Sequence, residues 1–167
     1  MPEHREGTPE DLRDLESFLW WDFDDLEIWR TWATKRGWSD ASKSYNEALE
    51  VQEALRALQR ANNGMELASA QVERVNRAIE AHGVKPQVSG SGDFAVGQSR
   101  ADDPVGHVLS LAVLAMTRGV WRRFKVCRDE VCRASYYDAT KNGAKTWCSM
   151  DTCGSRNKMR RYRAKGG

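Results

Sequence analysis

Four cysteines in the C-terminal third of the 167-residue chain have the spacing of a metal site. They form two C-x4-C pairs, Cys127/Cys132 and Cys148/Cys153, with fifteen residues between the pairs. Each pair can bring two thiolates to one ion, and tetrahedral zinc binds thiolates at about 2.3 Å. The spacing therefore predicts one structural Zn²⁺ held by four cysteines. Disulfides or free thiols are the alternatives, although disulfides would require an oxidising compartment.

The predicted zinc site is closed to catalysis. None of the three histidines (His4, His82 and His107) lies near the cysteines, so the cysteines would supply all four ligands. Four protein ligands leave no coordination position for a water nucleophile. The sequence also contains no phosphate-binding loop, nucleophile elbow or catalytic metal motif. We therefore predict that the protein is not an enzyme and assign no catalytic residue.

A hairpin is predicted between the two cysteine pairs. Residues 133–138 have the aromatic content of a strand, Asn142-Gly143 is typical of a tight turn, and residues 145–147 would return the chain to Cys148. A cysteine knuckle, a hairpin and a second pair leading into a helix indicate a treble-clef-like module. A segment of about 45 residues has too little core to fold alone, so zinc binding should be coupled to its folding.

The basic residues are concentrated around and after these cysteines. Residues 1–117 contain 12 Lys/Arg and 20 Asp/Glu, a net charge of −8. Residues 118–167 contain 14 Lys/Arg and 4 Asp/Glu, a net charge of +10. This asymmetry is typical of a chain whose basic part binds nucleic acid or another polyanion. A solvated charged tail without a partner is the alternative.

A basic helix is predicted from Asp151 onward, because no proline follows and no glycine interrupts residues 155–165. On a helical wheel, Ser155, Met159 and Tyr162 share a narrow face between two rows of cations. We expect this face to dock on the zinc module and the cations to remain in solvent. The predicted nucleic-acid contacts are six cations of this helix and three of the module: Arg156, Lys158, Arg160, Arg161, Arg163, Lys165, Arg133, Lys141 and Lys145.

In this region the chain resembles the bacterial CGNR (Cys-Gly-Asn-Arg) zinc-finger family. Besides the four cysteines, the resemblance rests on D-x-T-K-N-G at 138–143, W-C-S-M at 147–150 and C-G-x-R-x-K at 153–158. It implies an upstream helical domain of the ABATE type and a role as a stress-linked, DNA-binding transcriptional regulator. Two positions depart from the family pattern: Ser155 stands where the naming motif has Asn, and Tyr162 where His is common.

The residues before the cysteines are predicted to form an acidic, mostly helical domain, 1–123, followed by the zinc module, 124–167. Apolar residues at helical spacing and the breaker Asn62-Asn63-Gly64 predict an antiparallel helix pair near the middle of this domain. Asp103-Pro104 is a start signal for an apolar core helix that leads into the module without a linker. Helices are expected at residues 10–20, 22–35 and 105–123. Two more are expected around the apolar repeats 48–58 and 65–79, with the break at 62–64 between them and His82-Gly83 at the end of the second.

A small hairpin is expected at residues 84–100, turning on the Gly/Ser-rich residues 89–92, with a flexible loop as the alternative. The fold class is thus mainly α, with a helical N-terminal domain that contains this hairpin. A C-terminal treble-clef-like four-cysteine zinc module ends in the basic helix. The two parts are expected to pack as one rigid body.

Five tryptophans crowd the first forty residues. We expect them to pack in the core, with partly exposed rings at a homodimer interface. A pocket for an unidentified small-molecule effector is the alternative. The tryptophans are Trp20, Trp21, Trp29, Trp32 and Trp38.

The predicted function is a DNA-binding transcriptional regulator in which zinc positions the basic helix and the acidic domain senses a signal or dimerises. A zinc-braced module that binds an acidic protein is one alternative. RNA binding is another, favoured if Tyr136 or Trp147 exposes its ring for base stacking. The N-terminus has no apolar signal core, and the longest apolar stretch, 108–116, is too short to cross a bilayer. We therefore expect a cytoplasmic protein without a membrane partner, nucleoid-associated if it binds DNA.

Overall fold

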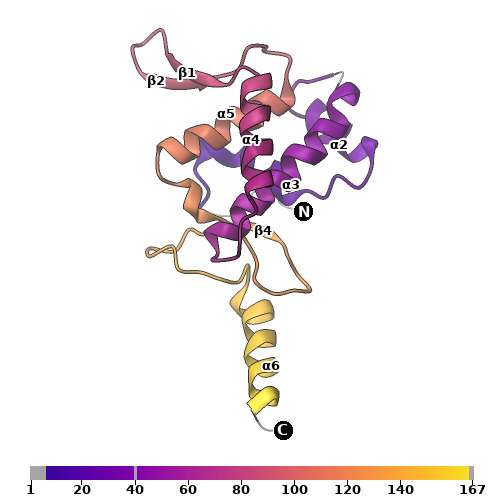
Figure 1. Ribbon diagram of the computed structural model, residues 1–167, viewed down its shortest axis with the longest axis vertical. Helices are drawn as coiled ribbons and strands as arrows, with labels where there is room; N and C mark the ends of the chain where they lie inside the picture. Colours follow the sequence, from indigo (N-terminus) through magenta and orange to yellow (C-terminus); the bar gives the residue numbers. More distant parts are fainter. Residues whose placement is uncertain (1–6, 40, 166–167) are drawn as a thin grey trace.

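The computed structural model describes residues 7–39 and 41–165. In these residues helices predominate over two small antiparallel sheets, and the four cysteines cluster near the C-terminal end, as the sequence predicts (Figure 1). The elements are η1 (Glu10–Leu12), α1 (Arg13–Trp20), α2 (Leu26–Thr34), η2 (Ser42–Ser44), α3 (Tyr45–Asn62), α4 (Ser69–Ala81), β1 (Lys85–Val88), β2 (Phe94–Gly97), α5 (Pro104–Thr117), η3 (Trp121–Arg123), β3 (Phe124–Val126), β4 (Ser135–Tyr137), η4 (Met150–Gly154) and α6 (Ser155–Lys165).

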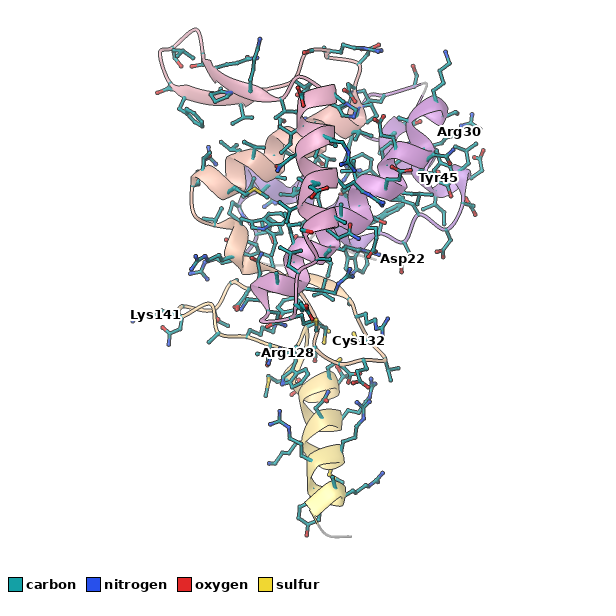
Figure 2. The ribbon with its side chains drawn as sticks, viewed as in Figure 1. Asp22, Arg30, Tyr45, Arg128, Cys132 and Lys141 are labelled. Carbon is teal, nitrogen blue, oxygen red and sulfur yellow. The ribbon has the colours of Figure 1, made fainter. Side chains whose placement is uncertain are left out.

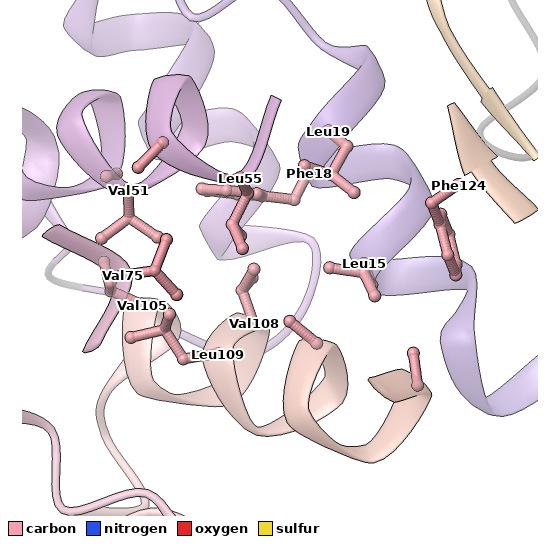
Figure 3. Packing of buried hydrophobic residues seen from close by; sticks show 14 of the residues in the cluster. Leu15, Phe18, Leu19, Val51, Leu55, Val75, Val105, Val108, Leu109 and Phe124 are labelled. Carbon is pink, nitrogen blue, oxygen red and sulfur yellow. The ribbon is translucent and has the colours of Figure 1, made fainter. Parts of the chain in front are cut away.

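The main core lies where α1, α3, α4 and α5 meet (Figure 3). Each helix contributes apolar side chains to it, among them Phe18 from α1, Leu55 from α3, Val75 from α4 and Val108 from α5, all at most 4% exposed. α5 is apolar on nearly all sides, and eight of its residues are buried. This burial removes a large apolar area from water, which is the main source of stability for a helical body of this size.

Two of the five tryptophans are fully buried in this core. The rings of Trp29 and Trp32 stack with their centroids 5.3 Å apart, and Phe23 meets both of them edge-on. Their indole nitrogens donate to the Ala41 carbonyl and the Ser17 hydroxyl, so both of these buried N–H groups are paired. Core packing is therefore confirmed for these two tryptophans.

Helices α3 and α4 form the predicted antiparallel pair. The loop after Asn62 joins the end of α3 to the start of α4, and His82, just past α4, lies 3.0 Å from Glu47 near the start of α3. The prediction that the second helix begins at residue 65 is wrong, because α4 begins at Ser69.

Two other helix boundaries differ from the predictions. α2 begins at Leu26 rather than near residue 22, because the Asp25 side chain caps it by accepting from the Ile28 amide. α5 ends at Thr117 and does not run on to residue 123. Gly119 adopts φ +71°, and the amides of residues 119 and 120 donate back to the carbonyls of residues 116 and 115, as in a Schellman C-cap.

The predicted hairpin at residues 84–100 is confirmed. β1 pairs with β2 in antiparallel register from Lys85–Gly97 to Val88–Phe94, and the turn closes with a hydrogen bond from the Ser89 amide to the Asp93 carbonyl. This hairpin lies at the end of the molecule opposite α6 (Figure 1).

The strand expected at residues 133–138 has a different partner from the one predicted. β4 pairs with β3, upstream of the first cysteine, and not with residues 145–147. All residues of β3 and β4 are buried, because the two-stranded sheet lies between the helical body and the cysteine-containing loops. Phe124 and Tyr137 pack in the main core, while Tyr136 packs against Cys127 and Cys153 on the other face.

The C-terminal end of α3 joins the body to the cysteine-containing segment through buried amide side chains. Gln59 and Ser135 exchange hydrogen bonds of 2.8 and 3.1 Å. The Asn62 side chain donates to the carbonyls of Trp121 and Phe124. The Asn63 side chain donates to the carbonyls of Val126 and Thr146. The two parts of the chain therefore share a fixed polar interface. Separately, none of the helices in the described residues has the length and apolar character needed to cross a membrane.

Candidate metal centre and basic helix

The four predicted ligands come together in one cluster. The Sγ atoms of Cys127, Cys132, Cys148 and Cys153 all lie within 4.8 Å of one another, and no two are joined in a disulfide. The Cys132–Cys148 and Cys148–Cys153 sulfur distances are 3.5 and 3.7 Å. Four sulfurs about 2.3 Å from a tetrahedral ion would be about 3.8 Å apart. The cluster therefore fits one metal ion bound by four thiolates.

The first cysteine pair sits on a knuckle after β3. The Cys127 amide donates to the Ala134 carbonyl, and the amides of Cys132 and Arg133 both donate to the Asp129 carbonyl. Arg133 adopts φ +47°, the only positive φ at a non-glycine residue in the described chain. This left-handed residue reverses the chain directly into β4, so that both sulfurs face the second pair.

The second pair is positioned by a π-helical turn, η4, that continues into α6. The Ser149 hydroxyl accepts from the Thr152 amide, and the Ser149 carbonyl accepts from the Gly154 amide. A side chain at position 154 would come within 3.1 Å of Met150, so glycine allows the tight turn. Because Cys153 precedes α6 by two residues, the metal site and the start of the basic helix form one unit.

The cysteine thiols have unequal proton affinities in this cluster. Burial raises the pKa of Cys148, and its neighbouring thiols raise it further. Burial also raises the pKa of Cys153. Burial opposes ionisation of Cys132 too, but hydrogen bonds with the Ala134 backbone and the other thiols lower its pKa overall. Metal binding must therefore displace protons, which makes affinity for the ion pH-dependent.

A buried ion pair between Lys125 and Asp138 organises the loop between the two cysteine pairs, in place of the predicted strand pairing. Lys125 and Asp138 are 4% and 0% exposed, and Lys125 Nζ lies 2.8 Å from Asp138 Oδ2. The same ammonium donates to the carbonyls of Gly143 and Lys145, and Asp138 accepts from the amides of Thr140 and Lys145. Burial opposes ionisation of Asp138, but these bonds lower its pKa overall.

The Asn142-Gly143 turn lies where the sequence predicts it, since the Gly143 amide donates to the Thr140 carbonyl and Gly143 adopts φ +59°. Side chains hold the returning segment in place of strand pairing. The Tyr136 hydroxyl donates to the Lys145 carbonyl, and the Arg128 amide donates to the Thr146 carbonyl. This arrangement explains why residues 145–147 form no strand.

A second buried carboxylate, Asp129, connects the knuckle to α6. Its Oδ1 accepts from the amides of Val131 and Cys132, while its Oδ2 accepts from Asn157 Nδ2 at 3.0 Å and Arg156 Nη1 at 3.3 Å. Arg160 Nη2 lies 3.8 Å from Oδ1. Burial opposes ionisation of Asp129, but the two amides and Arg156 lower its pKa overall. The first turn of α6 is therefore clamped to the metal site.

Beyond this clamp α6 extends away from the rest of the molecule (Figures 1 and 2). The prediction that its apolar face docks on the module is wrong, because Met159 is 53% and Tyr162 77% exposed. The physical reason is the position of the helix start: α6 begins two residues after Cys153 and leads directly out of the cluster. Only its first residues, 156–160, lie close enough to Asp129 for contact.

The predicted nucleic-acid contacts are not equivalent in position. Arg156 and Arg160 are about half exposed and each pairs with the buried Asp129. Lys158, Arg161 and Arg163 are also exposed, and no ion pair of theirs is present in the described chain. The side chain of Lys165 is outside the described part of the chain.

The three cations predicted outside α6 lie on the loops of the module. Arg133 is exposed, and Lys145 lies over the Tyr136 ring. Figure 2 shows Lys141 on a loop to the side of the module, away from α6. Tyr136 itself is fully buried and offers no exposed ring for base stacking, and Trp147 is partly buried against the cysteines.

Sequence reasoning missed Lys125, Asp129 and Asp138 as organising residues. Asp138 begins the D-x-T-K-N-G run of the family resemblance, and a weaker signal exists for each of the other two. Lys125 is a lone charge between the apolar residues Phe124 and Val126, and Asp129 stands within the first C-x4-C loop. Neither signal specifies the charged or amide side chain that pairs with it, because Asp138 is 13 residues from Lys125 and Asn157 is 28 residues from Asp129.

Residues 123–166 match the family model of the CGNR zinc finger. The matched CGNR segment contains the four cysteines, the Lys125–Asp138 pair, Asp129 and all of α6. A search of curated proteins found no match to the chain.

The two departures from the CGNR pattern have distinct environments. The Ser155 hydroxyl donates to the Met150 carbonyl across the π-helical turn. Asn157, two positions later, donates both to Asp129 and to the Cys153 carbonyl, so an Asn still joins the knuckle to the helix start. Tyr162 lies on the exposed part of α6 and contacts neither the cysteines nor the clamp.

Proposed function

We propose that this protein is a DNA-binding transcriptional regulator whose four cysteines hold one structural Zn²⁺. The observation that carries the proposal is the direct connection between the four-sulfur cluster and a basic helix that extends into solvent. Thiolate ligands in tetrahedral spacing favour zinc among the common metals. In this proposal the metal is structural, no residue is catalytic, and the module has a treble-clef-like arrangement of knuckle, sheet and helix.

DNA is the proposed partner because of the charge and form of α6. The helix carries six Lys/Arg and no Asp/Glu, on a chain whose first 117 residues have a net charge of −8. Cations at this density gain affinity for a duplex by releasing counterions from its phosphates. The acidic part of the chain would keep the rest of the protein away from the DNA backbone through repulsion.

In this proposal the upstream helices form an ABATE-type domain that senses a signal or mediates homodimer formation. One cleft in the described chain, about 1000 Å³ in volume, is lined by polar and charged residues of this part, including Arg36, Trp38, Glu47, His82 and Asp103. A cleft of this size supports an effector role, with the effector unidentified. A cytoplasmic, nucleoid-associated location follows from the proposed partner.

The test is DNA binding by the zinc-loaded full chain across a salt series, with a random duplex beside an RNA competitor. We expect steep salt dependence and a preference for duplex DNA, which would justify selecting the target sequence from a random pool. Failure to bind duplex DNA at low salt, with stoichiometric zinc confirmed, would contradict the proposal. Preferential binding of RNA, or co-purification of an acidic protein in place of DNA, would replace it with the corresponding alternative.

A further inference from the structure

The Asp129 clamp determines which side of α6 faces away from the protein. Arg156, Asn157 and Arg160 all contact Asp129, which is 0% exposed. In an α-helix successive side chains are about 100° apart, so these three occupy one side of the helix. The opposite side therefore carries Lys158, Met159 and Tyr162.

The side opposite the clamp combines exposed apolar groups with cations. Tyr162 is 77% exposed and Met159 53% exposed. Arg161 and Arg163, the chain neighbours of Tyr162, project about 100° to either side of it. Arg163 continues the row of Arg156 and Arg160, about one turn beyond the last residue that contacts Asp129. Within the described chain no hydrogen bond or ion pair holds the helix beyond Arg160, so this end of α6 is accessible from several directions.

We infer that Lys158, Met159 and Tyr162 face the floor of the DNA major groove, while Arg161 and Arg163 reach the phosphates on its two sides. This inference rests on the proposed function and adds the orientation of the helix. A major groove about 12 Å wide admits one α-helix and surrounds it on both sides. Cations flanking an apolar centre match that shape, because phosphates line the rim and base edges, including thymine methyl groups, line the floor.

In this arrangement Asp129 is a positioning residue. It holds Arg156 and Arg160 on the protein side of α6, so in this arrangement these two cations pair with Asp129 and do not contact phosphates. The reading surface consists of the five exposed side chains for which no contact with Asp129 is present: Lys158, Met159, Arg161, Tyr162 and Arg163. The loop cations Arg133 and Lys141 lie outside this surface.

The experiment compares three double variants of the zinc-loaded full chain that each lose two positive charges. They are Arg161→Ala/Arg163→Ala on the reading surface, Arg156→Ala/Arg160→Ala on the clamped side, and Arg133→Ala/Lys141→Ala on the loops. Each lost phosphate contact lowers the log–log salt slope of DNA binding by about 0.9. We expect the first variant to lower the slope by about 1.8 and the other two to leave it almost unchanged.

A fourth variant, Met159→Ala/Tyr162→Ala, tests the groove floor. Both side chains are exposed and alanine favours helix, so the fold should persist, as zinc content and circular dichroism would verify. We expect binding to a selected site to weaken about tenfold or more at an unchanged salt slope, because apolar base contacts release no counterions. Binding to a random duplex should change less.

The outcomes separate this inference from the proposed function. If the wild-type chain binds DNA with steep salt dependence, but the clamped-side or loop variant loses as much slope as Arg161→Ala/Arg163→Ala, the orientation is wrong and the proposed function stands. An unchanged affinity in Met159→Ala/Tyr162→Ala would likewise remove these residues from the interface. Absence of DNA binding by the wild-type chain would overturn both.

Discussion

The helical body and the cysteine module use different physical means to hold their chain segments. The body buries large apolar side chains from five helices, α1 to α5, including the stacked Trp29 and Trp32 of α2. The module buries few apolar groups and instead contains four thiols, one buried lysine and two buried aspartates. A packed apolar core is stable without a ligand, whereas clustered thiols and buried charges are stable only when each has its partner.

The contrast predicts that loss of one thiol will affect the module alone. Cys148→Ser should abolish stoichiometric zinc binding and unfold the cysteine-containing loops, because structural zinc contributes about 10–16 kcal/mol of apparent binding energy to such modules. Phe124 and Tyr137 belong to the main core, so β3 and β4 should be affected less. Zinc analysis and hydrogen exchange would measure both effects, with exchange in α1, α3 and α5 largely retained. Val131→Ser, at a side chain 75% exposed between Cys127 and Cys132, is the control. Retention of one zinc per chain by the cysteine variant would contradict the four-thiolate site.

The opposite perturbation is a cavity in the body. Trp32→Ala removes a fully buried ring and should lower the free energy of unfolding by about 3–5 kcal/mol. Urea denaturation would measure this loss, and Phe94→Ala, at a ring 55% exposed on the β1–β2 hairpin, should cost much less. Zinc stoichiometry in the folded variant should stay at one. Loss of zinc from the folded Trp32→Ala variant would show that the two parts depend on each other more than their separate cores indicate.

The buried ion pair of the module allows a sharper test. Asp138→Asn leaves the Lys125 ammonium buried without its counter-charge and should cost about 3 kcal/mol or more. The double variant Lys125→Met/Asp138→Leu should cost less than this single change, because it removes both buried charges. Denaturation curves and the rate of zinc transfer to a chelator would compare them, with the exposed Asp151→Asn as the control. Equal loss in both variants would mean that hydrogen bonds, and not charge balance, dominate this site.

The smallest expected effect is a pH dependence confined to the body. His82 Nδ1 lies 2.5 Å from Asp103 Oδ2, and this contact raises the pKa of His82 above its ordinary 6.5. The stabilisation is therefore complete below pH 6.5 and is lost as the pH rises through the folded-state pKa of His82.

The partner carboxylate titrates in the opposite sense. Burial opposes ionisation of Asp103, but the contact with His82 and the Gly106 amide lower its pKa below 3.8, so its contribution is lost as the pH falls through the lowered value. His82→Gln should flatten the pH dependence of unfolding free energy above pH 6.5. Denaturation at several pH values would measure this slope. A slope identical to that of the wild-type chain would place the pH dependence elsewhere.

Several local features of this fold follow from short stretches of the sequence. The spacing of the cysteines predicted the four-sulfur cluster, since ligand pairs separated by short loops have few other arrangements available. The Asp103-Pro104 signal located the start of α5, and the Gly/Ser-rich turn located the β1–β2 hairpin. These features depend on residues close together in the chain, where backbone geometry and capping leave few choices.

The strand partner of β4, the pairing of the buried Asp129 and Asp138 and the direction of α6 depend on contacts between segments far apart in the chain. β4 pairs with β3 because Phe124 and Tyr137 bury together on the helical core, which local turn signals do not encode. Of the six cations of α6, Arg156 and Arg160 pair with Asp129, because the start of the helix places them next to its buried carboxylate. The charge pattern of the sequence gives no reason to distinguish these six cations. Their positions relative to the buried Asp129 carboxylate distinguish the paired ones from the rest.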